Sequence, residues 1–150
     1  MTTADLLDFM RQHILAVEAS VSPTGAPQAA VIGFAVSDAL EIVFDTNAAS
    51  RKVANLRHNP TVAFAIGGTT RGDDRSVQYQ GIADEPVGPE LQRLKELYFE
   101  VLPDGGQRET WPDITYIRVR PDWIRYVDFN PRSSRNRRVR SDAIRRFGVT

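Results

Sequence analysis

Most of this chain consists of short segments in which apolar residues alternate with polar ones or form brief apolar runs. Alternation is typical of a strand with one exposed face, and a short apolar run is typical of a buried strand. Polar turns separate most of these segments, which favours antiparallel pairing over crossover connections. The sequence therefore predicts a mainly β fold with peripheral helices, in which six to seven antiparallel strands form a small closed or nearly closed barrel. The predicted strands are 14–21, 29–36, 40–46, 61–68, 76–87, 115–121 and 122–129.

Three other segments carry apolar residues at helical spacing. The first, 5–13, follows Thr3, a residue type that favours helix caps. The second has an apolar stripe from Ala49 to Leu56 and should end before Pro60. The third, 89–102, begins with a proline, which is tolerated in a first helical turn. We expect these helices to pack around the barrel.

Composition excludes several classes of protein. The 150 residues, 41% hydrophobic and 25% charged, fit one globular domain. Cysteine is absent, which excludes disulfides, thiolate metal sites and a thiol nucleophile. His13 and His58 do not have the spacing of a metal motif, so no metal site is predicted. There is neither an apolar run long enough to cross a bilayer nor a signal peptide at residues 1–10, so we expect no membrane association and a cytoplasmic location.

The charge is distributed unevenly, although the formal net charge is zero. Residues 131–150 contain seven arginines and one aspartate, so the acidic residues lie almost entirely in the first 130. We predict a domain over 1–130 and a basic C-terminal tail over 131–150. Such a tail is able to neutralise nucleic-acid phosphates. The acidic body and the single aromatic residue of the tail, Phe147, argue against nucleic-acid binding as the main function.

The stretch FDTNAASRKVANLRHNP, residues 44–60, contains the most informative motif. Ser50, Arg51 and Lys52 fall where a helix should begin, although cations oppose the positive end of a helix dipole. Hydroxyls, free backbone N–H groups, a guanidinium and an ammonium within seven residues form a pocket suited to an anion, especially a phosphate. The alternative is a solvated cationic helix edge.

With this motif the chain resembles the pyridoxamine 5′-phosphate oxidase-like family, the flavin-binding split β-barrels. The resemblance covers roughly residues 6–128 and is strongest in Thr46-Asn47-x-x-Ser50-Arg51-Lys52 and in the following Asn55-Leu56-x-x-Asn59-Pro60-x-Val62. It implies a split β-barrel in which the Ser-Arg-Lys turn holds the phosphate of flavin mononucleotide, FMN. It also implies a homodimer with the flavin at the subunit interface.

The same resemblance assigns further cofactor contacts. It places the isoalloxazine ring of the flavin against the strand that contains Ala30, Val31, Ile32 and Gly33. The alternative is that these residues belong to the core of the barrel. It implies that Asp45 and Thr46 contact the flavin just before the phosphate turn. Where the oxidases carry a flavin-contacting glutamine this chain has Ser76, and Gln78, on the same strand face, is a candidate substitute.

The C-terminal end departs from the oxidases. Their Arg-x-His substrate motif is missing after Asp128, which argues against vitamin B6 as the substrate. A flavin brings its own hydride and electron chemistry, so no catalytic residue is assigned. The resulting hypothesis is an FMN-dependent oxidoreductase acting on an unidentified small molecule. The alternatives are a deazaflavin-dependent reductase and a non-catalytic flavin-binding or stress-related module.

Overall fold

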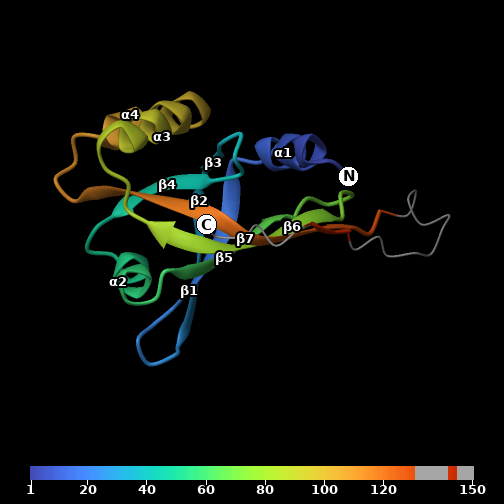
Figure 1. The fold of residues 1–150 in the computed structure, drawn as a ribbon, viewed down its shortest axis with the longest axis horizontal. Helices are drawn as coiled ribbons and strands as arrows, with labels where there is room; N and C mark the ends of the chain where they lie inside the picture. Colours follow the sequence, from blue (N-terminus) through green and yellow to red (C-terminus); the bar gives the residue numbers. More distant parts are fainter. Residues whose placement is uncertain (131–141, 145–150) are drawn as a thin grey trace.

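The fold is a curled antiparallel half-barrel with four helices at its periphery (Figure 1). The computed structural model describes residues 1–130 and the backbone of residues 142–144. The rest of the predicted basic tail lies outside the described residues. The sheet order is β2-β1-β5-β6-β7-β4-β3, with β8 paired to β7. The strands are β1 (Leu15–Val21), β2 (Pro27–Gly33), β3 (Ala35–Val36), β4 (Ile42–Asn47), β5 (Thr61–Gly67), β6 (Arg75–Asp84), β7 (Ile114–Asp128) and β8 (Asp142–Ile144).

Strand alternation follows the sequence pattern closely. In β5 and β6 every second side chain is buried, as period-two patterning requires. The mainly β, antiparallel prediction is confirmed. The predicted strand 29–36 is divided into β2 and β3.

The two C-terminal strands predicted around Pro121 form one continuous strand, β7, so this part of the prediction is wrong. The register of β6 against β7 shifts between Gln80 and Gly81, which lies opposite Pro121. A proline is tolerated at such an irregularity because it has no N–H to contribute to the ladder. A Cβ on Gly81 would clash with the carbonyl oxygen of Arg120, so only glycine permits this close approach.

The helices are α1 (Thr3–Arg11), α2 (Arg51–His58), α3 (Gly88–Val101) and α4 (Gly105–Arg108). Three lie where the sequence predicted them, whereas α4 was not predicted. Thr2, rather than Thr3, caps α1 through a capping box with Asp5. Ala49 precedes α2 and is exposed, so it does not belong to the buried stripe. None of the helices within residues 1–130 is long and apolar enough to cross a membrane.

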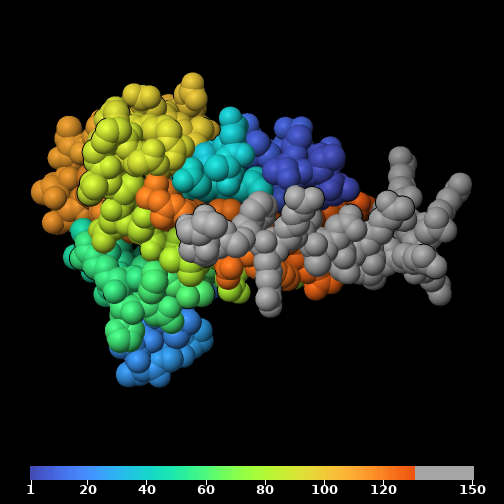
Figure 2. Space-filling view, viewed as in Figure 1, coloured from blue at the N-terminus to red at the C-terminus, as the bar shows by residue number. Residues whose placement is uncertain are grey.

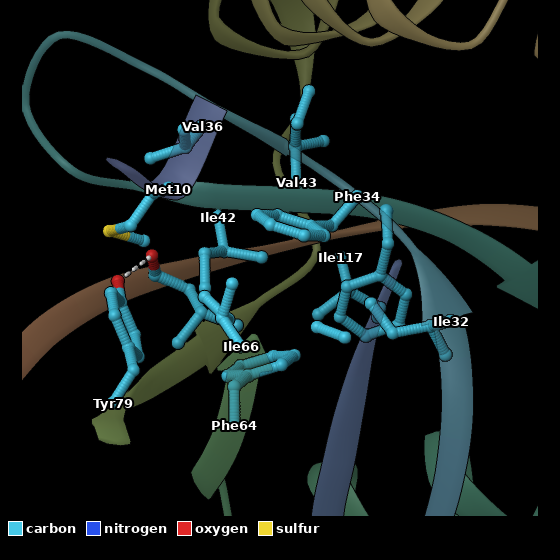
Figure 3. Packing of buried hydrophobic residues seen from close by; sticks show 14 of the residues in the cluster. Met10, Ile32, Phe34, Val36, Ile42, Val43, Phe64, Ile66, Tyr79 and Ile117 are labelled. Carbon is cyan, nitrogen blue, oxygen red and sulfur yellow. Dashed lines mark hydrogen bonds between the residues drawn. The ribbon is translucent and has the colours of Figure 1, made fainter. Parts of the chain in front are cut away.

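Aromatic and branched side chains fill the concave side of the sheet (Figure 3). Phe64 packs edge-on against Tyr79, with ring centroids 5.7 Å apart. The buried hydroxyl of Tyr79 donates to the carbonyl oxygens of Leu40, at 2.8 Å, and Val119, at 3.0 Å. The backbone of Leu40 has a positive φ of 61°, so these contacts hold a strained turn just before β4.

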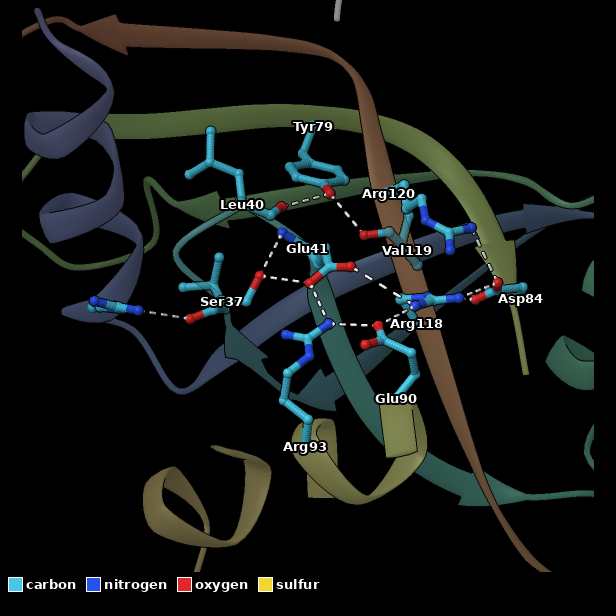
Figure 4. Close-up of polar contacts among 12 residues, drawn as sticks. Ser37, Leu40, Glu41, Tyr79, Asp84, Glu90, Arg93, Arg118, Val119 and Arg120 are labelled. Atoms are coloured by element: carbon cyan, nitrogen blue, oxygen red, sulfur yellow. Dashed lines mark hydrogen bonds and ion pairs between the residues drawn. The ribbon is translucent and has the colours of Figure 1, made fainter. Parts of the chain in front are cut away.

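A cluster of charged side chains joins α3 to the sheet (Figure 4). Arg118 of β7 is buried and forms ion pairs with Asp84, at 2.6 Å, and Glu90, at 2.9 Å. Glu41 accepts hydrogen bonds from the Ser37 hydroxyl, at 2.8 Å, and from Arg93, at 3.0 Å. The N-terminal half of α3 is thereby fixed against β4, β6 and β7.

Candidate functional site

The loop between β4 and α2 brings the predicted phosphate-binding residues together. Thr46 Oγ1 lies 3.5 Å from Ser50 Oγ and 3.5 Å from Lys52 Nζ. The side chain of Asn47 shapes the loop by accepting from the backbone N–H of Ala49 at 2.7 Å. Two hydroxyls and an ammonium therefore face one small volume beside the start of the helix. We call Thr46, Ser50, Arg51 and Lys52 the anion turn.

The start of α2 carries uncompensated positive charge. Ser50 is the N-cap and accepts from the Val53 N–H at 3.4 Å, while the earlier N–H groups of the helix have no intrahelical partner. The first turn contains no acidic residue. Arg51 is exposed and, among the described residues, its guanidinium has no hydrogen bond or ion pair. These features are those of an anion-binding helix start.

Asp45, the residue before Thr46, is engaged by the helices above it. Its carboxylate accepts from the Tyr98 hydroxyl at 2.8 Å and from Arg108 Nε at 2.8 Å. Burial raises the pKa of Tyr98, and the neighbouring Asp45 raises it further, so this tyrosine remains a neutral donor. Asp45 therefore anchors α3 and α4 beside the anion turn.

A pocket of about 270 Å³ opens next to the turn. Trp111 forms an exposed aromatic part of its wall, with 57% of the residue accessible. The pocket shares Thr46 with the anion turn, so a ligand held at the turn by a phosphate is able to extend into it. The lining residues are Asp45, Thr46, Asn47, Arg108, Trp111, Pro112, Asp113 and Ile114.

The strand predicted to face the flavin ring, Ala30 to Gly33, lies at an edge of the sheet. Within the described part of the chain β2 pairs with β1 alone. Its other edge therefore presents backbone groups to a ligand. Ile32 is buried in the core, whereas Val31 is exposed on the opposite face. Ile32 thus belongs to the core, as one interpretation of this strand predicts, while contact of the strand with a flavin ring stays a prediction.

Glu18 of β1 is the residue that pairs with Ala30 in the sheet. The charge of Lys52, a residue of the anion turn, acts on the carboxylate of Glu18. Glu18 is fully buried, and among the described residues neither carboxylate oxygen has a hydrogen-bond partner. The sequence analysis missed this residue. A signal is present in LAVEASV, residues 15–21, where the polar residues fall on the buried phase of the strand.

Nearby, buried polar side chains hold α2 against β1 and β2. The side-chain amide of Asn55, on α2, donates to Ser20 Oγ at 3.1 Å and to Gln28 Oε1 at 2.9 Å. Both amide hydrogens are thus used, which fixes the rotation of the helix. In the space-filling view α2 (green) lies between the β1–β2 hairpin (light blue) and the α3–α4 segment (yellow) (Figure 2). The anion turn is therefore supported by hydrogen bonds between α2 and the strands β1 and β2.

Ser76 and Gln78 lie far from the anion turn within one chain. Along β7, Thr46 pairs with Thr115 whereas Ser76 pairs with Val127. Twelve residues of strand correspond to about 40 Å of contour length. Gln78 instead lines a groove of about 290 Å³ on the outer face of the sheet. The structure does not bring these two residues to the anion turn.

Within the described residues, no group of three or more histidine, aspartate or glutamate side chains is placed to hold a metal ion. The candidate site consists of the anion turn and the adjoining pocket, which share Thr46.

Comparison with known proteins gives one family and a group of similar folds. A family model described as pyridoxamine 5′-phosphate oxidase matches residues 2–128. Among curated proteins none matches. Three similar solved structures illustrate the range of the fold. The first is a conserved hypothetical protein from Mycobacterium tuberculosis, with 27% identity, a TM-score of 0.71, and coverage of 85% of each chain.

The second is a heme-binding protein from Mycobacterium smegmatis, with 18% identity and a TM-score of 0.75. The alignment covers 85% of this chain but 54% of that protein, so the chain spans about half its length. The third is a pyridoxamine 5′-phosphate oxidase-related, FMN-binding protein from Nostoc punctiforme, with 15% identity and a TM-score of 0.62. The alignment covers 83% of this chain and 81% of that protein. At 18% and 15% sequence identity, the similarity to these last two proteins demonstrates a shared fold.

Proposed function

This chain belongs to the pyridoxamine 5′-phosphate oxidase family, and from that premise we propose that it binds FMN and serves as an FMN-dependent oxidoreductase for a small-molecule acceptor. The observation that carries the proposal is the anion turn, in which Thr46, Ser50 and Lys52 converge at a helix start free of acidic residues. The FMN-binding neighbour from Nostoc punctiforme supports the choice of ligand.

The residues present fit the phosphate of a flavin. Arg51 has an exposed, unpaired guanidinium among the described residues, and a guanidinium is able to bind two phosphate oxygens at once. Ser50 and Thr46 supply hydroxyls, and the first turn of α2 supplies backbone donors. When bound, the flavin would supply hydride transfer, while the chain binds it and controls access to its ring.

We further propose that the protein is a homodimer with the flavin at the subunit interface. The outer face of the sheet leaves apolar side chains exposed, with Leu15 at 56%, Val17 at 36% and Val31 at 67% accessible. Apolar residues on the exposed phase of a strand favour coverage by a partner. Ser76 and Gln78, which are remote from the turn of their own subunit, would serve the flavin of the partner or lie outside the site.

FMN titration tests the cofactor assignment. We expect wild-type protein to bind FMN and Arg51→Ala/Lys52→Ala to bind it about a hundredfold more weakly, because two charge-assisted contacts are lost. Arg57→Ala/Arg71→Ala removes the same formal charge from exposed positions outside the anion turn, together with the Arg57–Glu85 ion pair at the far end of α2, and should bind as wild type does. Equal FMN affinity in the wild type and the turn variant would contradict the proposal.

The spectrum of the purified protein and its redox behaviour test the remaining alternatives. Flavin, deazaflavin and heme have distinct absorbance spectra, so the cofactor acquired during expression is identified directly. Reoxidation of the reduced flavoprotein by candidate acceptors would support an enzyme. Failure with every acceptor, despite tight FMN binding, would favour the non-catalytic module.

A further inference from the structure

Glu18 is a buried acid located behind the anion turn. It has no accessible surface, and among the described residues both carboxylate oxygens lack a hydrogen-bond partner. Glu18 and Ser20 lie two apart on β1 and share its inner face, while Lys52 and Asn55 lie three apart on α2 and share one side of the helix. Asn55 donates a hydrogen bond to Ser20 across the contact between α2 and β1. The same contact brings the charge of Lys52, on α2, to act on Glu18, on β1.

Lys52 is the charged group that faces Glu18. In register, Glu18 lies opposite Ala30 of β2 and Phe64 of β5, both uncharged. Within the described chain, α2 alone contributes a charge that acts on this carboxylate, the ammonium of Lys52. Burial raises the pKa of Glu18, while Lys52 and the nearby Ser20 hydroxyl oppose this effect without cancelling it.

We propose that Glu18 takes up a proton when a dianion binds at the anion turn, so that anion binding and protonation of this buried acid are coupled. The inference rests on the proposed function because it concerns the site that would hold the flavin phosphate. An anion at the turn engages Lys52 and adds negative charge near Glu18. Both changes disfavour the carboxylate, which accepts a proton from solvent and becomes a neutral acid.

The sign of the coupling follows from linkage. If binding takes up a proton, the affinity for the anion decreases as pH rises through the range in which free Glu18 loses its proton. Inorganic sulfate is a suitable probe because it remains a dianion throughout this range, whereas the phosphate of FMN titrates near pH 6. We expect sulfate to bind about fivefold more weakly at pH 8 than at pH 5, the lower end of typical coupling between ligands.

The test combines two probes with matched variants of the full chain. Sulfate binding is measured from pH 5 to pH 9 by the shifts of the backbone amide signals of residues 50–53. FMN binding is measured by calorimetry at intervals from pH 5 to pH 9 in buffers of different ionisation enthalpy, which gives the number of protons taken up at each pH. The difference between wild type and Glu18→Gln removes the contribution of the FMN phosphate. Glu18→Gln keeps the shape of the side chain but cannot ionise. Glu100→Gln removes the same charge from the exposed surface of α3.

We expect proton uptake and a pH-dependent sulfate affinity in wild type and Glu100→Gln, and neither in Glu18→Gln. FMN binding that takes up no more protons in wild type than in Glu18→Gln at any pH, or the same sulfate pH profile in both, would overturn the inference while leaving the proposed function intact. Coupled sulfate binding without FMN binding would support the inference and contradict the proposed function. If neither anion binds, both are wrong.

Discussion

Two buried glutamates, Glu41 and Glu18, differ in the hydrogen bonding of their carboxylates. Glu41, just before β4, is 8% accessible and accepts from Ser37 and Arg93, with Arg118 3.9 Å away (Figure 4). Glu18, on β1, is fully buried, and neither of its oxygens has a hydrogen-bond partner in the described chain. The carboxylate of Glu41 accepts hydrogen bonds from two donors, whereas that of Glu18 is acted on by the charge of Lys52 and the nearby Ser20 hydroxyl.

The difference separates a structural role from a functional one. A buried charge is tolerated when its hydrogen bonds are satisfied, and Glu41 meets this condition by joining β4 to α3 and β7. An unsatisfied buried acid is costly, and such groups concentrate at functional sites. At Glu18 burial raises the pKa of the carboxyl, and the nearby charge of Lys52, a residue of the anion turn, lowers it.

The largest effect should come from removing Arg118, the cation at the centre of the paired cluster. Arg118→Met leaves Asp84, Glu41 and Glu90 without their shared buried counter-charge. We expect a loss of about 3–5 kcal/mol in the free energy of unfolding, typical of breaking a buried ion pair from one side. Urea denaturation at pH 7 measures it.

Arg120→Met is the control for that prediction. Arg120 also pairs with Asp84, at 3.2 Å, but its side chain is 57% accessible. Its removal should cost less than about 1 kcal/mol, as exposed pairs do. If both variants lost the same free energy of unfolding, the burial of Arg118 would not increase its contribution to stability.

A smaller loss should follow Glu41→Gln, which keeps the shape of the side chain and removes its charge. Ser37 and Arg93 both donate to one oxygen, Oε2, so the amide oxygen keeps these hydrogen bonds without the help of a negative charge. The amide NH2 group then replaces Oε1, which lies 3.9 Å from the cation of Arg118. We expect destabilisation of about 1–3 kcal/mol at pH 7. Glu90→Gln alters an exposed carboxylate that binds the same arginines and should have a clearly weaker effect. A stable Glu41→Gln variant would remove the contrast with Glu18.

Much of the fold could be predicted because its signals are local. Alternation in β5 and β6 and the helical spacing of α2 reflect the positions that are buried. The continuity of β7 through Pro121 could not be predicted, since it depends on an irregularity of the partner strand at Gly81. The short helix α4 begins with two glycines, which are poor helix formers, so propensity gave no indication of it.

The candidate site likewise has a part that local sequence signals predict and a part that depends on long-range packing. The grouping of the anion turn was predictable because its residues lie within seven positions of one another, and the structure places the side chains of Ser50 and Lys52 within 3.5 Å of Thr46. The anchoring of Asp45 by Tyr98 and Arg108 joins residues more than fifty positions apart. Asn55 and Ser20 likewise meet through the packing of α2 on β1, which no local pattern specifies, and the same packing brings the charge of Lys52 to act on Glu18.

The smallest effect we expect concerns Glu18 and is confined to part of the pH scale. Because its pKa is raised in the folded state, the acid is neutral in both states below 4.5, the ordinary pKa of a glutamate, and Glu18→Gln should then match wild type in stability. As pH rises through the folded pKa, wild type must ionise a buried carboxylate and loses stability relative to the variant. The difference is about 1.4 kcal/mol for each unit that separates the folded and unfolded pKa values.

Urea denaturation of Glu18→Gln and wild type from pH 4 to pH 9 measures this difference, with Glu100→Gln as the control that should show no comparable trend. Comparing the variant with wild type at each pH removes the contribution of the paired carboxylates, whose lowered pKa values act with the opposite sign, as for Asp84 and Glu85. If Glu18→Gln instead loses stability relative to wild type with rising pH, Glu18 is an ionised partner of Lys52. It would then belong with Glu41 among the structural charges, and the proton-coupled anion turn would have no acid to carry the proton.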